Sequence, residues 1–172
     1  MATWNVIGAL LCGAAAALTS VGPQEPDTLF QFADDSPAEW IVVNDGVMGG
    51  LSRSEFVGTD AGFATFRGEM SLVNNGGFAS VRGYLPNGIP ADARVVELRV
   101  RGDGRSYQVR LRMGERFDGI AYRAEFEPTF RGYRPRNAAP LTLGDVRQLG
   151  LMIADKKTGS FSLDVEWIRA VE

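Results

Sequence analysis

The sequence predicts an all-β protein folded as a β-sandwich or jelly roll. Two observations lead to this fold class: apolar and polar residues alternate along many short segments, and turn signals separate those segments. Such alternation places one set of side chains in a core and the other in solvent. Glycine supports the same fold, because it makes up 21 of the 172 residues, more than the usual ~7%.

The clearest alternation lies in residues 105–113, where Tyr107, Val109, Leu111 and Met113 form the inward-facing set. Further strands are expected at 29–32, 40–43, 55–57, 62–66, 69–73, 78–82, 96–100, 119–126, 151–153 and 161–167. Runs such as Asn44-Asp45-Gly46 mark turns, because Asn, Asp and Gly tolerate left-handed backbone. Strands at this spacing favour a single sandwich domain.

One short helix is expected at residues 143–149. Thr142 would be its N-cap, the Asp145 side chain would accept a hydrogen bond from a backbone N–H of the first turn, and Gly150 would end the helix. The run 151–153 would then be a buried strand.

The N-terminal segment reads differently from the rest of the chain. The first 24 residues carry no charge, and residues 6–21 form an apolar run broken only by small residues. This suits the apolar region of a secretory signal, although the Lys or Arg that normally starts one is missing. The run is also almost long enough to span a bilayer, which takes ~20 residues.

We therefore expect residues 1–22 to be a signal peptide or an uncleaved membrane anchor, with a buried helix as a third reading. Residues 23–28 would be a linker and residues 29–172 the folded domain. The protein would be exported (periplasmic or secreted) or membrane-anchored rather than cytoplasmic. It would touch a membrane only through residues 6–21, if these are retained.

Composition excludes several kinds of chemistry. The chain has no histidine and one cysteine, Cys12, so it has no Ser-His-Asp triad, no histidine-ligated zinc and no intrachain disulfide. The net charge of −3 does not suit a nucleic-acid binder. We expect no cofactor.

Carboxylates and metal ligands give weak signals. Asp164 with Glu166, and Glu125 with Glu127, have a spacing that a glycosidase could use, but surface acids two apart are ordinary, and a hydrolase ranks last. A calcium site at Asp34 and Asp35 would lack a spaced acidic loop, so no metal site is predicted.

Four loops are richer than ordinary turns. They are residues 44–52, 74–82, 101–105 and 155–159. Gly49-Gly50 removes side chains where a ligand or another backbone comes close, and paired asparagines offer donors and acceptors. Each loop also has a plain structural reading as a hairpin or tight turn. The Arg-Gly-Asp of 101–103 is too short to indicate adhesion.

These segments, in this order, resemble the complex I intermediate-associated protein 30 family, and we take the chain to be similar to its bacterial members. The most specific pair is Asp-Gly-Val-Met-Gly-Gly at 45–50 and Asn-Asn-Gly-Gly-Phe at 74–78. The other matching segments are Trp40, 66–68, 79–82, 101–105 with Tyr107, 128–132, 149–153 and 155–161.

The resemblance implies a galactose-binding-like jelly roll and no catalytic residues. Mitochondrial members help to assemble respiratory complex I by holding a membrane-arm intermediate. By resemblance, this chain would be a chaperone-like module that binds another protein or a membrane-complex intermediate. The alternative is a carbohydrate- or small-polar-ligand-binding module, for which Tyr84, Phe130 and Tyr133 are the exposed aromatic candidates. The residues that the resemblance offers for binding a ligand or partner are Asp45, Asn75, Arg82, Arg131, Asp155 and Lys156.

The chain departs from the family pattern around residues 127–128. Members of the family carry a strand and loop between the counterparts of Phe126 and Pro128, and here these positions join directly. One strand of the jelly roll is therefore expected to be missing, which would leave a sheet edge open to pairing.

Overall fold

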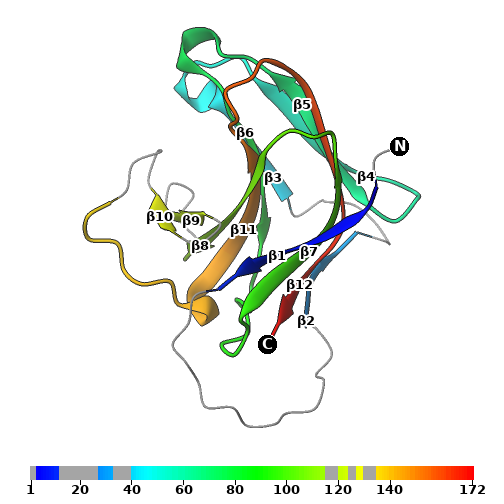
Figure 1. Cartoon of the computed structure of the whole chain (residues 1–172). Helices are drawn as coiled ribbons and strands as arrows, with labels where there is room; N and C mark the ends of the chain where they lie inside the picture. Colours follow the sequence, from blue (N-terminus) through cyan, green and yellow to red (C-terminus); the bar gives the residue numbers. More distant parts are fainter. Residues whose placement is uncertain (1–2, 12–26, 33–39, 115–119, 124–126, 130–134) are drawn as a thin grey trace.

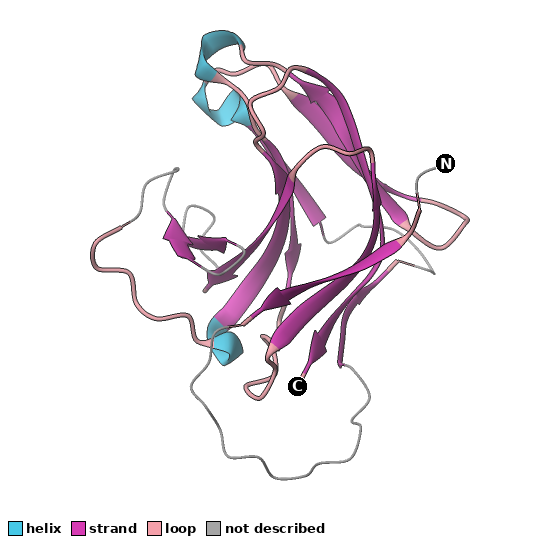
Figure 2. Cartoon of the chain, viewed as in Figure 1, coloured by secondary structure: helices cyan, strands magenta, loops and turns pink. Residues whose placement is uncertain are grey.

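Two antiparallel β-sheets form nearly the whole fold (Figures 1 and 2). The computed structural model describes residues 3–11, 27–32, 40–114, 120–123, 127–129 and 135–172. Its strands are β1 (Asn5–Leu10), β2 (Asp27–Gln31), β3 (Trp40–Asn44), β4 (Arg53–Gly58), β5 (Ala64–Met70), β6 (Ala79–Tyr84), β7 (Val95–Gly102), β8 (Tyr107–Met113), β9 (Ala121–Arg123), β10 (Glu127–Thr129), β11 (Val146–Ile153) and β12 (Gly159–Val171). The predicted β-sandwich is confirmed.

The sheets differ in how their strands are ordered. Sheet A runs β1-β7-β12-β5-β4, and β2 also pairs with β12. Sheet B runs β10-β9-β8-β11-β6-β3. Strand β12 is central to sheet A, because it pairs with β2, β5 and β7 along its 13 residues.

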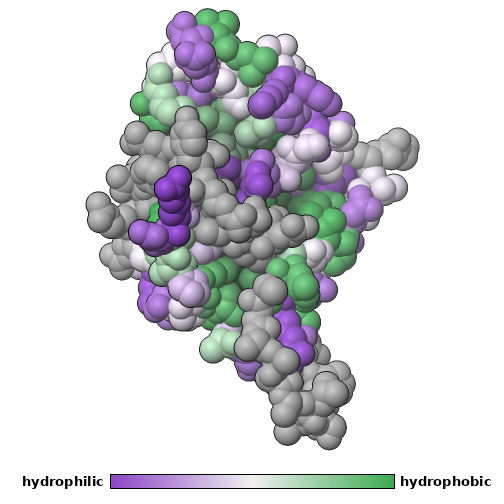
Figure 3. Space-filling view, turned by 60° about the vertical axis from the view of Figure 1, so that its left-hand side comes forward, coloured by the Kyte–Doolittle hydropathy of each residue, from purple (hydrophilic) through white to green (hydrophobic). Residues whose placement is uncertain are grey.

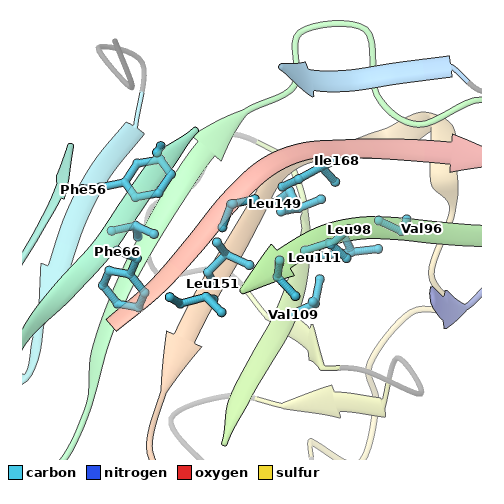
Figure 4. Close-up of a cluster of buried hydrophobic side chains, with 14 of the residues drawn as sticks. Phe56, Phe66, Val96, Leu98, Val109, Leu111, Leu149, Leu151 and Ile168 are labelled. Carbon is cyan, nitrogen blue, oxygen red and sulfur yellow. The ribbon is translucent and has the colours of Figure 1, made fainter. Parts of the chain in front are cut away.

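The core lies between the sheets, where the inward-facing residues of the alternating strands meet. Sheet A contributes Phe66 and Leu98, and sheet B contributes Leu111, Leu149 and Leu151, all nearly or fully buried (Figure 4). Burial of these apolar side chains supplies the main favourable free energy of folding. The alternation in the sequence therefore identified the core face of β8, where Val109 and Leu111 were expected to face inward.

The helix predicted at 143–149 is wrong. Only Leu143–Asp145 turns, as a single 3₁₀ turn, and Thr142 makes no side-chain cap. From Val146 the chain enters β11, which pairs with β6 on one side and β8 on the other. Two-sided pairing and burial of Val146 and Leu149 outweigh the local helix signal.

The separate strands expected at 62–66 and 69–73 are one continuous strand, β5. Gly68 lies inside it because β4 passes close by: a Cβ at Gly68 would overlap the backbone carbonyl oxygen of Arg53. The glycine therefore marks a close approach of two strands rather than a break.

The N-terminal segment includes an edge strand of sheet A. Residues 5–10 form β1, which pairs antiparallel with β7, and Val6 and Leu10 stay exposed. No helix among the described residues has the length and apolarity to cross a membrane. Residues 12–26 lie outside the described residues, and the export signal or anchor stays a prediction.

Candidate functional site

The carboxylate of Asp45 joins the two glycine-rich loops that carry the most specific motifs. Asp45 has no exposed area. Its Oδ1 accepts the backbone N–H of Ser52 at 2.9 Å, and its Oδ2 accepts the Ser52 hydroxyl at 2.5 Å. Oδ2 also accepts the N–H of Gly77 at 2.6 Å and that of Phe78 at 3.3 Å. One buried side chain thus connects the start of β4 with the start of β6.

These hydrogen bonds decide the charge state of Asp45. Burial by itself would raise the pKa of the carboxyl, but the donors from Ser52, Gly77 and Phe78 outweigh it and hold the pKa below the usual 3.8. Asp45 is therefore a buried anion that the protein itself satisfies.

Glycines are required around this carboxylate because it fills the space that their side chains would need. A Cβ at Gly50 would overlap the carboxylate of Asp45, and one at Gly76 would lie 2.7 Å from its Oδ2. Gly50 and Gly76 are thus part of the packing of Asp45, whereas Gly49 and Gly77 adopt positive φ, of 88° and 122°.

Further bonds connect the same two loops. Asn74 donates from Nδ2 to the carbonyl oxygen of Gly49 at 3.1 Å, and the N–H of Asp45 donates to the carbonyl oxygen of Phe78 at 3.2 Å. Asn74 and Asn75 both adopt left-handed backbone, with φ of 57°. The two 3₁₀ turns, Asp45–Met48 and Val73–Asn75, therefore lie together at one end of the sandwich (Figure 1).

Large apolar side chains stand in solvent on these two loops. We call them the apolar tip, and their exposed fractions run from 41% to 66%. Its members are Val47, Met48, Leu51, Leu72 and Val73. Hydrophobic residues are visible at this end of the molecule in Figure 3. Contiguous exposed apolar residues on a soluble domain are typical of interaction sites.

A second fixed structure lies at the hairpin before β12. Arg105 forms a two-pronged ion pair with Asp155, Nε–Oδ2 at 2.9 Å and Nη2–Oδ1 at 2.7 Å, and only 5% of the Asp155 side chain is exposed. Arg105 also donates to the carbonyl oxygens of Lys157, Gly159 and Ser160. The ion pair with Arg105 lowers the pKa of Asp155. Asp155 therefore shapes the hairpin that presents Lys156.

Those carboxylates considered for catalysis or adhesion that the structure describes form contacts within the protein. Asp164 pairs with Arg101 and accepts from Thr65, and Glu166 pairs with Arg99. The Asp103 carboxylate accepts hydrogen bonds from the backbone N–H groups of Arg105 and Ser162. The Arg-Gly-Asp tripeptide is therefore part of a tight turn. No cluster suited to a metal ion occurs among the described residues. Asp34, Asp35 and Glu125 lie outside them, and the side chain of Glu127 is not described.

Four of the predicted binding residues that the structure describes lie at the same end of the sandwich, because β11 ends opposite Ala79 and β12 begins opposite Met70. Asp45 is buried beneath the apolar tip and Asn75 is exposed beside it. Asp155 and Lys156 share the hairpin before β12 at this end, whereas Arg82 lies on β6, between β11 and the edge strand β3 of sheet B. Arg131 lies outside the described residues, as do the aromatic candidates Phe130 and Tyr133. Tyr84, the third, is 40% exposed.

Sequence reasoning missed the exposed apolar residues between the glycines. The available signal was the run Val47-Met48-Gly49-Gly50-Leu51, in which three large apolar residues fall inside a turn, where polar residues are usual. It also missed a cavity of ≈ 360 Å³. The cavity lies beside β1, β7 and β8, with Ile7, Val100 and Tyr107 among its lining residues.

Solved structures with the same architecture are carbohydrate-binding modules. A family 11 module from Clostridium thermocellum, in complex with a β-1,3-1,4-mixed-linked tetrasaccharide, has a TM-score of 0.57 and 13% identity, covering 85% of this chain and 95% of that chain. The family 11 module of the cellulosomal cellulase Lic26A-Cel5E of C. thermocellum has a TM-score of 0.58 and 13% identity, covering 90% and 97%. At this identity the likeness shows the jelly-roll fold alone.

Comparison of sequences adds one finding. No curated protein matches the chain. A family model, described as complex I intermediate-associated protein 30, matches residues 30–129 and 123–165. The two pieces meet at the region where the sequence departs from the family pattern.

Proposed function

The chain belongs to the complex I intermediate-associated protein 30 family, and from this we propose that it is a non-catalytic binding module that holds another protein or a membrane-complex intermediate. The observation that carries the proposal is the apolar tip. It is formed by the motif that is most specific to the family, residues 45–50, together with the loop that Asp45 ties to it.

The tip is suited to binding because it is held in place before a partner arrives. Asp45 and Asn74 fix the loops internally, so little backbone entropy is lost on docking. Met48 adds an adaptable side chain that can fit an irregular apolar surface. An apolar surface on a protein subunit is the chemistry that this patch matches.

Site-specific photo-crosslinking in the cells that make the protein tests this function. A photoreactive residue at position 47 or 51 should crosslink the full chain to one defined protein. The same residue at Ile41 or Val57, which are exposed but away from the tip, should not. Crosslinks that do not differ between tip and control positions would rule out the tip as the docking surface.

A variant gives a second readout. Replacing Val47, Met48 and Val73 together by serine should abolish co-purification of the crosslinked protein and leave the thermal unfolding temperature nearly unchanged, because the side chains are exposed. If the partner is retained, the contact lies elsewhere.

Carbohydrate binding is the alternative, and the resemblance to carbohydrate-binding modules supports its fold alone. A glycan array with the full chain should stay blank if the module binds protein. Saturable binding to one glycan, lost on Tyr84→Ala, would instead favour the alternative.

We also propose that residues 1–22 serve as an export signal or membrane anchor. Cleavage there would remove β1 and expose the edge of β7. Mass spectrometry of the protein from its own cells tests this: an intact Met1 in the soluble fraction would contradict it.

A further inference from the structure

Arginines line up across the outer face of sheet B, the face turned away from the core. Gly150 of β11 is in register with Arg82 of β6 on one side and Arg110 of β8 on the other, and Arg110 is in register with Arg123 of β9. Arg112, two residues along β8, points to the same face. A Cβ at Gly150 would lie 3.5 Å from Nη1 of Arg112 and 3.6 Å from Cγ of Arg82. The arginine side chains therefore lie close together over Gly150, which has no side chain of its own.

Arg110 and Arg112 form no ion pair with a carboxylate among the described residues. Strands β3, β6, β8, β9 and β11 contain no acidic residue, and β10 adds Glu127, in register with the outermost arginine, Arg123. The contrast with sheet A is sharp, because there Arg67, Arg99 and Arg101 each pair with a carboxylate.

Arg112 is the most buried of these arginines, with only 7% of its surface exposed to solvent. Its Nε is buried without a hydrogen-bond partner, and no described residue forms an ion pair with it. Burial and the neighbouring charges of Arg82 and Arg110 lower the pKa of Arg112 to about 9. A buried cation next to other cations is costly unless an anion meets it.

Arg110 connects this buried group to solvent. It is half-buried, and its only described hydrogen bonds go to Oε1 of Gln108 on its own strand, at 3.0 Å and 3.3 Å. That amide is neutral, so none of the described hydrogen-bond partners of Arg110 compensates its positive charge. Arg123 beyond it is exposed.

We propose that this cluster, centred on Arg110 and Arg112, is a binding site for a ligand that carries an oxyanion, either a carboxylate or a phosphate. Guanidinium groups present paired N–H donors in a plane that matches both groups, and several of them around one point bind an anion more strongly than one. The site is on the face of sheet B, whereas the apolar tip is formed by loops at the end of the sandwich. It goes beyond the proposed function and does not depend on it.

Thermal unfolding and calorimetric titration of the full chain test the site with two probes, inorganic phosphate and citrate. Against sodium chloride of the same ionic strength, at least one probe should raise the unfolding temperature and bind saturably. Binding of phosphate alone assigns the site to phosphate ligands, binding of citrate alone assigns it to carboxylates, and binding of both supports the shared chemistry. No binding of either probe overturns the proposal, and it would mean that the chain satisfies these arginines itself.

Variants distinguish the site from general attraction of anions. Arg112→Met keeps most of the side-chain volume and should weaken binding by at least about tenfold, which corresponds to the loss of one charge-assisted hydrogen bond. Arg110→Gln should weaken it similarly and serves if Arg112→Met does not fold. Arg53→Gln, at an exposed arginine on sheet A, should leave binding unchanged. Equal binding by the Arg110 and Arg53 variants would overturn the proposal.

Discussion

Gly77 donates its backbone N–H to Oδ2 of Asp45 at 2.6 Å, across a separation of 32 residues. This bond explains why the two most specific motifs of the sequence occur together. The Asp-Gly-Val-Met-Gly-Gly run supplies the acceptor, and the Asn-Asn-Gly-Gly-Phe run supplies backbone donors. The motifs are two halves of one internal structure that carries the apolar tip.

Replacing Asp45 by Asn should destabilise the protein by about 3 kcal/mol, because an amide keeps the size but loses the charge that accepts these hydrogen bonds. Chemical denaturation measures the free energy of unfolding. Asp60→Asn is the matched control, since Asp60 lies in an exposed turn, and it should change little. Equal effects of the two substitutions would show that Asp45 has no special role.

Replacement by alanine should destabilise the protein at Gly50 and have little effect at Gly46, four residues earlier. Gly50→Ala places a Cβ in the carboxylate of Asp45 and should cost about 1–3 kcal/mol of unfolding free energy. Gly46→Ala meets nothing within 4 Å and should stay within about 0.5 kcal/mol of the wild type. If Gly50→Ala leaves the stability unchanged, the loop around Asp45 is not closely packed against the carboxylate.

Arg105 and Asp155 should be coupled in a double-mutant cycle. Arg105→Ala should lower the free energy of unfolding by about 2–3 kcal/mol, because it removes a two-pronged ion pair of which only 12% and 5% of the side chains are exposed. After Asp155→Ala, the same substitution should cost less, and the difference is the coupling energy of the pair. The exposed pair Arg67–Glu55 offers a comparison, where the cycle should give a far smaller coupling. Additive effects at Arg105 and Asp155 would contradict the proposed clamp.

Acid should weaken the protein through Asp45 and Asp155. The pKa of each carboxyl is lower in the folded protein than the usual 3.8, so the folded state favours the charged form. This stabilisation is fully present above that value and is lost as the pH falls through the lowered folded pKa. Urea unfolding at a series of pH values measures it. The stability difference between wild type and Asp45→Asn should be largest near neutral pH and shrink in acid; a constant difference would argue against the lowered pKa of Asp45.

The fold class could be predicted from the sequence because alternation is local information. The segment 105–113 already assigned Val109 and Leu111 to the core and Arg110 and Arg112 to the other face. The 143–149 segment failed for the opposite reason. Its cap signal is local, but β11 is decided by strands β6 and β8, which are distant in sequence.

The candidate site could be predicted only in part. Asp45 was singled out as a binding residue, whereas its carboxylate is buried and accepts hydrogen bonds from Ser52 and from the later loop. The sequence could not show this burial, because Gly77 and Phe78 are distant from Asp45 along the chain. The arginine row has the same limit. Alternation gives the face of each strand, whereas the register that aligns Arg110 with Gly150 and Arg82 arises from pairing between strands.

The central strand of sheet A, β12, is also the last strand to be synthesised. Strands β2, β5 and β7 all pair with β12, yet each leaves the ribosome before it. Until residues 159–171 emerge, these earlier strands present open edges that other chains could pair with. The nascent protein thus passes through a stage that favours protection by a chaperone, and completion of sheet A closes the fold in its last step.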